Sequence, residues 1–242
     1  MTDPKMPDDD ARDTARMKAV FVTGAAVLFA IMAFVSPFEG FAENAFPVEI
    51  ARLPLQPADY AFAIWGPILI WLVVHGFYGL FKRADAGVWD ATRWPLMASL
   101  VLGAVWLPIA IAAPEMATVL IWAMLATALL ALRRSPAGTD RWLLRAPIAL
   151  YAGWLTAASC VATALVAAGY GLGAPTVWSW VGLATALAIA LAVTRLIRDV
   201  PLYALGVCWA LIAVPVANWG ADWALLVGAL GGAAVIAAPE LG

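Results

Sequence analysis

The chain has 242 residues, of which 64% are hydrophobic and 12% are charged. A soluble domain is about half apolar and about a quarter charged, so this composition excludes an ordinary soluble protein and indicates an integral membrane protein. The net charge of −2 provides no basic surface for nucleic acid, and the two cysteines lack a CxxC partner, so neither a disulfide framework nor a zinc site is indicated.

The N-terminal segment, residues 1–18, is rich in acidic residues and precedes the first apolar run. A signal peptide would have an A-x-A cleavage pattern after its apolar region, and none follows the first apolar run here. We therefore predict that residues 1–18 form a disordered cytosolic tail.

Eight apolar stretches follow, each close to the length that crosses a hydrocarbon core of about 30 Å at 1.5 Å per residue. They cover residues 19–38, 59–81, 94–113, 116–132, 146–168, 176–197, 200–217 and 222–238. The run from 94 to 132 would be about 58 Å long as one helix. We therefore place a turn at 113–115, where proline stops the helix and glutamate prefers water, and a second turn at 218–220. The predicted fold is an all-α, polytopic membrane helix bundle of about eight transmembrane helices.

Lysine and arginine residues set the expected orientation. With eight spans, thirteen of them lie on one side and only Arg52 on the other. We expect a multi-pass protein of the inner (cytoplasmic) membrane with both termini in the cytoplasm. The longest outer connection, residues 39–58, is either an ordered loop over the mouth of the bundle or an amphipathic connector at the headgroups. In the last span, Gly228-x-x-x-Gly232 favours close packing within the chain over dimerisation.

The chain holds 13 tryptophans, and their positions divide them into two groups. Those at span ends or in loops fit an aromatic belt at the headgroups: Trp89, Trp94, Trp142, Trp178, Trp180, Trp219 and Trp223. Those within spans are Trp65, Trp71, Trp106, Trp122, Trp154 and Trp209. Each of these alone is more often a packing residue, but as a set they predict an aromatic pocket for a flat, apolar ligand.

His75, the only histidine, lies four residues after Trp71 and therefore on the same helix face. It would either ligate a metal-containing tetrapyrrole, relay a proton, or hydrogen-bond to a neighbouring helix. Asp59 opens the second span and is expected to cap its helix. The spans show no Ser-His-Asp spacing, carboxylate pair or phosphate loop, so we expect a protein that is not an enzyme.

The segment Q-P-A-D-Y-A-F-A-I-W-G-P-I-L-I-W, residues 56–71, resembles the start of the second span in the TspO/MBR family of tryptophan-rich sensory proteins. It is most similar to a longer, divergent branch of that family. Two further segments match in the expected order, Trp106-Leu107-Pro108 and Tyr151-Ala-Gly-Trp154-Leu-Thr-Ala-Ala158. The resemblance covers residues 19–168. It implies a five-helix membrane core at 19–170, followed by a three-helix extension at 171–242 that has no counterpart in five-helix members.

Members of this family bind porphyrins and other tetrapyrroles between their first loop and five helices. The resemblance implies that Tyr60, Phe62, Trp65, Trp106, Tyr151 and Trp154 contact such a ligand, and we add Trp71 and His75 as candidates. Two asparagines of the family pattern fall at Gly103 and Ala162, so the pocket is expected to be less polar here.

The main functional hypothesis is a sensory or regulatory membrane protein that binds a tetrapyrrole, such as a porphyrin or haem. The alternative is a structural or assembly subunit of a photosynthetic or respiratory membrane complex, and a weaker one is a small-molecule transporter. The expected partners are membrane lipid and a hydrophobic small molecule, together with a second copy of the chain or the subunits of a membrane complex.

Overall fold

The computed structural model describes residues 7–38, 40–41, 45–50, 52–138, 140–218 and 223–237. These residues are helical or lie in connections, with no strand among them. The helices are α1 (Pro7–Val35), the 3₁₀ helix η2 (Asp59–Ile64), α2 (Trp65–Lys82), α3 (Gly87–Ala112), α4 (Pro114–Arg134), α5 (Arg145–Gly169), α6 (Pro175–Leu196), α7 (Pro201–Ala217) and α8 (Trp223–Ala237). The predicted all-α bundle is confirmed.

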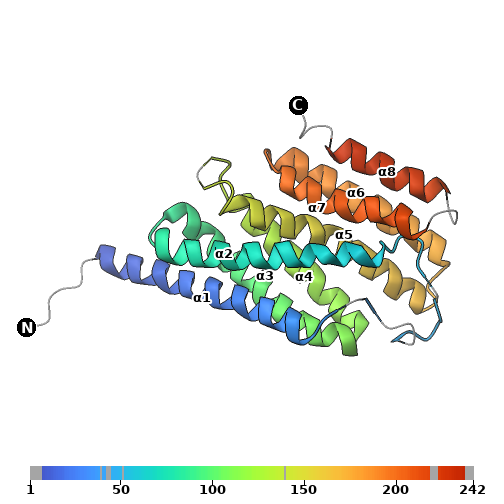
Figure 1. The fold of residues 1–242 in the computed structure, drawn as a ribbon, viewed down its shortest axis with the longest axis horizontal. Coiled ribbons are helices and arrows are strands. Elements are labelled where there is room, and N and C mark those ends of the chain that lie inside the picture. The colour runs from blue at the N-terminus through green and yellow to red at the C-terminus, as the bar shows by residue number, and fades with distance from the viewer. Residues whose placement is uncertain are drawn as a thin grey trace, which may run out of the picture.

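Helix α5 lies at the centre of the bundle, and α1 and α8 lie on opposite sides of it (Figure 1). It packs against α2, α4, α6 and α7, and all but a few of its residues are buried. Two glycines set the crossing of α5 and α7. A Cβ atom on Gly153 would lie 2.2 Å from the carbonyl oxygen of Tyr203, and one on Gly206 would lie 2.8 Å from that of Leu150. Helix α7 of the C-terminal extension is therefore in direct backbone contact with α5.

In the part of the chain that the structure describes, six helical segments are long and apolar enough to cross a membrane, namely α1, η2 with α2, α3, α4, α5 and α6. Helices α7 and α8 are equally apolar in character but have only 17 and 15 residues. Residue 113 separates α3 from α4, so the predicted turn at 113–115 is confirmed. Helix α7 ends at Ala217, next to the second predicted turn, of which residues 219 and 220 lie outside the described residues.

The N-terminal segment differs from the expected disordered tail. Residues 7–18 continue the first span as helix, and residues 1–6 lie outside the described part of the chain. The Nζ of Lys18 lies 2.8 Å from a carboxylate oxygen of Asp90, and Arg93 donates to the carbonyl oxygen of Ala15 at 2.7 Å. These contacts with α3 hold α1 at residues 15–18, and the polar residues before them continue the helix.

The two ends of the bundle differ in character. We call the end with the α2–α3, α4–α5 and α6–α7 connections the basic end, and the opposite end, with residues 36–58, the loop end (Figure 1). In the loop, Leu53 and Leu55 are fully buried, and the amide of Val48 donates to the carbonyl oxygen of Gly169 at 2.9 Å. The described part of this connection is therefore an ordered loop over the bundle.

Two local predictions were wrong. Asp59 makes no capping hydrogen bond, because its carboxylate is exposed and lies 3.5 Å from Arg52. Trp89 does not belong to an interfacial belt, since it is only 1% exposed. By contrast, Gly228 and Gly232 face Trp180, Leu183 and Leu187 of α6, as expected for packing within the chain.

Candidate ligand pocket

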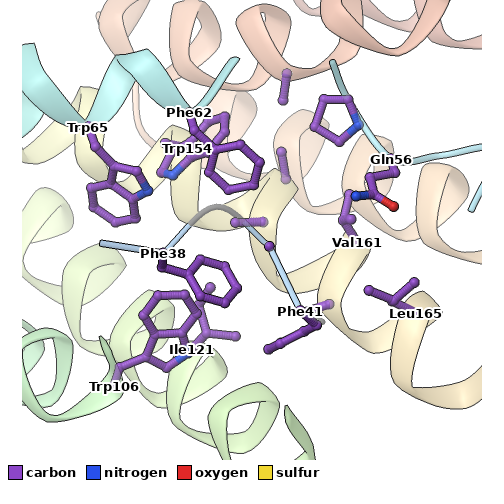
Figure 2. A pocket seen from close by; sticks show the side chains of 16 residues that line it. Phe38, Phe41, Gln56, Phe62, Trp65, Trp106, Ile121, Trp154, Val161 and Leu165 are labelled. Carbon is purple, nitrogen blue, oxygen red and sulfur yellow. The ribbon is translucent and has the colours of Figure 1, made fainter. Parts of the chain in front are cut away.

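A pocket opens at the loop end of the bundle, between the loop and the ends of α2, α3, α4, α5 and α7 (Figure 2). The pocket and its open mouth, including space open to solvent, enclose about 650 Å³ that protein atoms do not fill. Its walls are almost entirely apolar. They are formed by Phe38, Gly40, Phe41, Gln56, Pro57, Phe62, Trp65, Trp106, Ile121, Trp154, Ala157, Ala158, Val161, Ala162, Leu165 and Ala210.

The junction of η2 and α2 places one aromatic cluster in the wall. Phe62 lies in the last turn of η2 and Trp65 begins α2. Both rings meet Trp154 of α5 edge to face, with centroid distances of 5.9 Å and 6.2 Å. Phe29 of α1 backs this cluster at 5.6 Å from Trp65. Edge-to-face aromatic pairs have a preferred geometry, so the wall is held in one arrangement.

A second aromatic pair adjoins this cluster in the wall of the pocket. The ring of Phe38 lies 4.8 Å from that of Trp106, again edge to face. The Trp106 indole N–H donates to the carbonyl oxygen of Ala117 in α4 at 2.8 Å, which fixes the ring between α3 and α4. The rings of Phe38 and Phe62 are 6.2 Å apart, edge to face, so the pair and the cluster form one continuous aromatic wall. Figure 2 shows this wall on one side of the pocket and Gln56, Val161 and Leu165 on the other.

Helix α5 forms the floor with small aliphatic side chains. Ala162, one position where the family pattern has asparagine, lines the pocket and keeps it apolar. The other position, Gly103, faces the ring of Phe29, and a Cβ there would lie 2.7 Å from it. An asparagine at 103 is therefore incompatible with the position of Phe29, and the loss of polarity follows from the aromatic packing.

Polar groups in the wall are few. Gln56 is the only residue with a side-chain amide among the described lining residues. The indole nitrogen of Trp154 is buried and has no hydrogen-bond partner within the described protein. A buried N–H without an acceptor is costly, so a partner from a bound molecule or water would stabilise it.

The roof of the pocket is tied to α7. The amide of Ala58 donates to the carbonyl oxygen of Ala213 at 3.0 Å, and the side-chain amide of Asn218 donates to the carbonyl oxygen of Gln56 at 3.1 Å. These bonds join the segment that carries the pocket residues Gln56 and Pro57 to the C-terminal helices. The extension thus helps to shape the pocket, and Ala210 of α7 lines it directly.

The structure brings four of the eight predicted site residues together, namely Phe62, Trp65, Trp106 and Trp154. Tyr151 lies behind the wall, fully buried, and its hydroxyl is 3.0 Å from that of Ser99. Tyr60 points away and is 46% exposed, with its ring edge to face with Trp209 at 5.8 Å.

Trp71 and His75 are not among the described lining residues of the pocket. Trp71 stacks on Trp142 at 6.4 Å, and His75 stacks on Trp89 at 4.8 Å. The Nδ1–H of His75 donates to the carbonyl oxygen of Leu143, just before α5, at 2.8 Å. His75 is therefore a buried packing residue near the basic end, as the hydrogen-bonding alternative predicted.

The remaining tryptophans within spans also pack elsewhere. The indole of Trp122 donates to the hydroxyl of Thr163 at 2.8 Å, and that of Trp209 donates to the carbonyl oxygen of Ala61 at 2.9 Å. Neither lines the pocket.

A polar cluster at the basic end explains the burial of Trp89. Asp140 accepts a hydrogen bond from Arg83 at 2.6 Å and one from the Trp89 indole at 2.9 Å. The bond from Arg83 lowers the pKa of Asp140 below its usual range; partial burial opposes this shift, and the Trp89 bond adds to it. The cluster joins the α2–α3 and α4–α5 connections.

The sequence missed several residues that line the pocket. Phe38 and Phe41 follow α1, where their aromatic character was a usable signal. Ala210 carried no signal, because alanines are common throughout the chain. Among the described residues, no group of three or more His, Cys, Asp or Glu side chains is placed to hold a metal ion.

A family model described as TSPO-like protein matches residues 16–241 of the chain. The match extends through the three C-terminal helices, beyond the residues 19–168 that carried the resemblance in the sequence. No curated protein and no solved structure matches the chain.

Proposed function

Since the chain belongs to the family of TSPO-like proteins, we propose that it is a sensory or regulatory membrane protein that binds a flat, apolar ligand of the tetrapyrrole class. The observation that carries this proposal is the aromatic pocket. Phe38, Phe62, Trp65, Trp106 and Trp154 surround a space with almost no polar lining. Flat conjugated rings pack well between such side chains.

The pocket would hold a tetrapyrrole through ring packing against the aromatic side chains of its wall. His75 lies elsewhere, so the described lining offers no histidine to a bound metal. The residues that would hold the ring are the aromatic side chains of the wall, and Gln56 is the side-chain amide nearest to any polar substituent. This arrangement favours a binding protein over an enzyme.

The distribution of basic residues supports a location in the inner membrane with the basic end in the cytoplasm. Lys82, Arg83, Arg134, Arg141 and Arg198 lie at or next to the connections of that end. Cytoplasmic connections are enriched in such residues. Both termini would then be cytoplasmic, and the pocket would open toward the outer face.

Large apolar side chains exposed along the outside of the bundle support lipid as its immediate neighbour. Phe34, Ile70 and Phe81 are each more than half exposed, as are others on the remaining helices. In water such a surface would aggregate, whereas in a bilayer it meets acyl chains.

Titration of the purified protein with protoporphyrin IX, followed by the absorption of the porphyrin, tests the proposed ligand class. Saturable binding is expected, and Trp65→Leu or Trp154→Leu should weaken it by about threefold to tenfold, because each removes aromatic contacts. Trp142→Leu is the matched control, since Trp142 is exposed and lies outside the pocket. Absence of saturable binding, or equal affinities of all three variants, would contradict the proposal.

A further inference from the structure

Arg52 is bound to the roof of the pocket. Its Nη2 atom donates to the carbonyl oxygen of Pro57 at 3.1 Å, and Pro57 lines the pocket. The preceding residue, Gln56, also lines it, and the side-chain amide of Asn218 holds the carbonyl oxygen of Gln56. The guanidinium of Arg52 therefore lies directly beside the segment that roofs the pocket.

The guanidinium of Arg52 keeps donors for a further acceptor. Its contact with Pro57 and its ion pair with Asp59, at 3.5 Å, both use Nη2. Within the part of the chain that the structure describes, the Nε and Nη1 atoms of Arg52 have no partner, and the side chain is 38% exposed. A guanidinium matches a carboxylate better than any other common acceptor in proteins except phosphate. The position of Arg52 therefore offers a site for a carboxylate at the edge of the pocket.

The distribution of charge along the sequence makes Arg52 an exception. It is the one basic residue among the connections of the loop end, whereas the acidic residues Glu49, Asp59 and Glu115 belong to the same end. Carboxylates repel an anion, and a guanidinium attracts it. An anionic group on a ligand that enters from this end is therefore favoured beside Arg52.

The two sides of the pocket differ in chemistry. The aromatic wall lies on one side, and Gln56, Val161 and Leu165 lie on the other (Figure 2). A charged substituent has no place against the apolar wall, because burial of an unpaired charge is costly. Gln56 and Pro57 mark the place where the lining passes from apolar side chains to polar groups.

We propose that the ligand is a flat conjugated ring that carries a carboxylate on a short chain, and that Arg52 recognises this carboxylate. The ring packs against the aromatic wall, and its acidic substituent leaves the pocket past Gln56 to reach Nε or Nη1 of Arg52. This inference rests on the proposed function, because it requires a ring in the pocket. It assigns to Arg52 the selection of an acidic ring over its neutral ester.

Protoporphyrin IX and its dimethyl ester test the inference, because they share one macrocycle and differ in whether the two carboxylates are free. The absorption of the porphyrin measures both affinities in one detergent. The wild-type protein should prefer the free acid. Arg52→Gln should reduce the ratio of the two affinities by about threefold to tenfold and leave the affinity for the ester unchanged, because a charge-assisted contact is lost. A comparison of this ratio between proteins is independent of how the ester partitions into detergent.

Arg195→Gln is the matched control, since Arg195 is exposed at the basic end, and it should preserve the ratio. An unchanged ratio in Arg52→Gln would overturn the inference and leave the proposed function standing. Equal weakening of both ligands in Arg52→Gln would limit Arg52 to its bond with Pro57 and would also overturn the inference. Binding of neither ligand by the wild-type protein would count against the proposed function itself.

A second variant tests the same contact with the opposite sign. Asp59→Asn removes the carboxylate that lies 3.5 Å from Arg52 and competes for its guanidinium. Asp59 is exposed and makes no capping hydrogen bond, so the variant should fold normally. It should raise the affinity for the free acid by about twofold to threefold and leave that for the ester unchanged. A weaker affinity for the free acid alone would contradict the proposal.

Discussion

The indole N–H of Trp209 donates a 2.9 Å hydrogen bond to the carbonyl oxygen of Ala61, which lies 148 residues earlier in the chain. Ala61 directly precedes the pocket residue Phe62 in η2. Through this bond α7 contacts the turn of η2 that positions Phe62 in the wall of the pocket. The C-terminal extension and the ligand site are thus parts of one structure.

Replacement of Trp209 by phenylalanine should weaken porphyrin binding by a few fold. The ring contact with Tyr60 would remain, but the buried Ala61 would lose the partner of its carbonyl, at a cost of about 1–3 kcal/mol. Hydrogen exchange across residues 58–64 should become faster. Trp94→Phe, at a half-exposed position on α3, is the control and should change neither quantity. Unchanged exchange in Trp209→Phe would show that α7 does not hold η2.

Gly153→Ala should destabilise the bundle at the crossing of α5 and α7. The added Cβ would lie 2.2 Å from the carbonyl oxygen of Tyr203, a backbone atom that cannot rotate away. Overpacking of this kind costs about 1–3 kcal/mol, so the thermal unfolding temperature in detergent should fall. Gly24→Ala provides the comparison, because nothing lies within 4 Å of its added Cβ. That variant should be neutral or slightly stabilising, since alanine favours helix. A fall of the same size in both variants would refute the proposed crossing.

His75→Phe should lower stability without affecting ligand binding. Phenylalanine can keep the stacking on Trp89, but the carbonyl oxygen of Leu143 would lose its hydrogen bond in a buried site, at a cost of about 1–3 kcal/mol. The porphyrin affinity should equal that of the wild type, because His75 does not line the pocket. Thermal unfolding and porphyrin titration of the same preparation measure both effects. Loss of affinity with unchanged stability would instead assign His75 to the ligand.

The Arg83–Asp140 pair should make stability depend on pH in the acidic range. The pKa of Asp140 is lowered in the folded protein, so its ionised form is the one that the fold stabilises. That contribution is complete above the unfolded value of about 3.9 and is lost as the pH falls through the lower folded value. Thermal unfolding of the wild type should therefore decline below about pH 4, and Asp140→Asn should lack this component of the decline. Parallel pH profiles of the two proteins would contradict the assignment.

Local features of the sequence were sufficient for the helices. The length of each apolar run and the prolines between the runs determined eight helices close to their observed bounds, with Pro114, Pro175 and Pro201 each beginning a helix. The start of α1 was missed because residues 7–18 are polar, and the local pattern cannot show the contacts of Ala15 and Lys18 with α3.

Half of the predicted site residues line the pocket, and the other half show where prediction from the sequence stops. The four-residue spacing of Trp71 and His75 placed both on one helix face, but it could not show that Trp142, Trp89 and Leu143 cover that face. The burial of Trp89 likewise depends on an acceptor, Asp140, that comes from another connection.

The sequence by itself determined the membrane environment, the helices and the family, because hydrophobicity, helix length and short motifs depend only on the order of residues along the chain. Only the tertiary structure decided which aromatic side chains converge on the pocket and that Ala210 of α7 lines it. The physical reason is that a cavity is the space left between packed helices. It depends on contacts such as Trp209 with Ala61 and Gly153 with Tyr203, which join residues far apart in the chain.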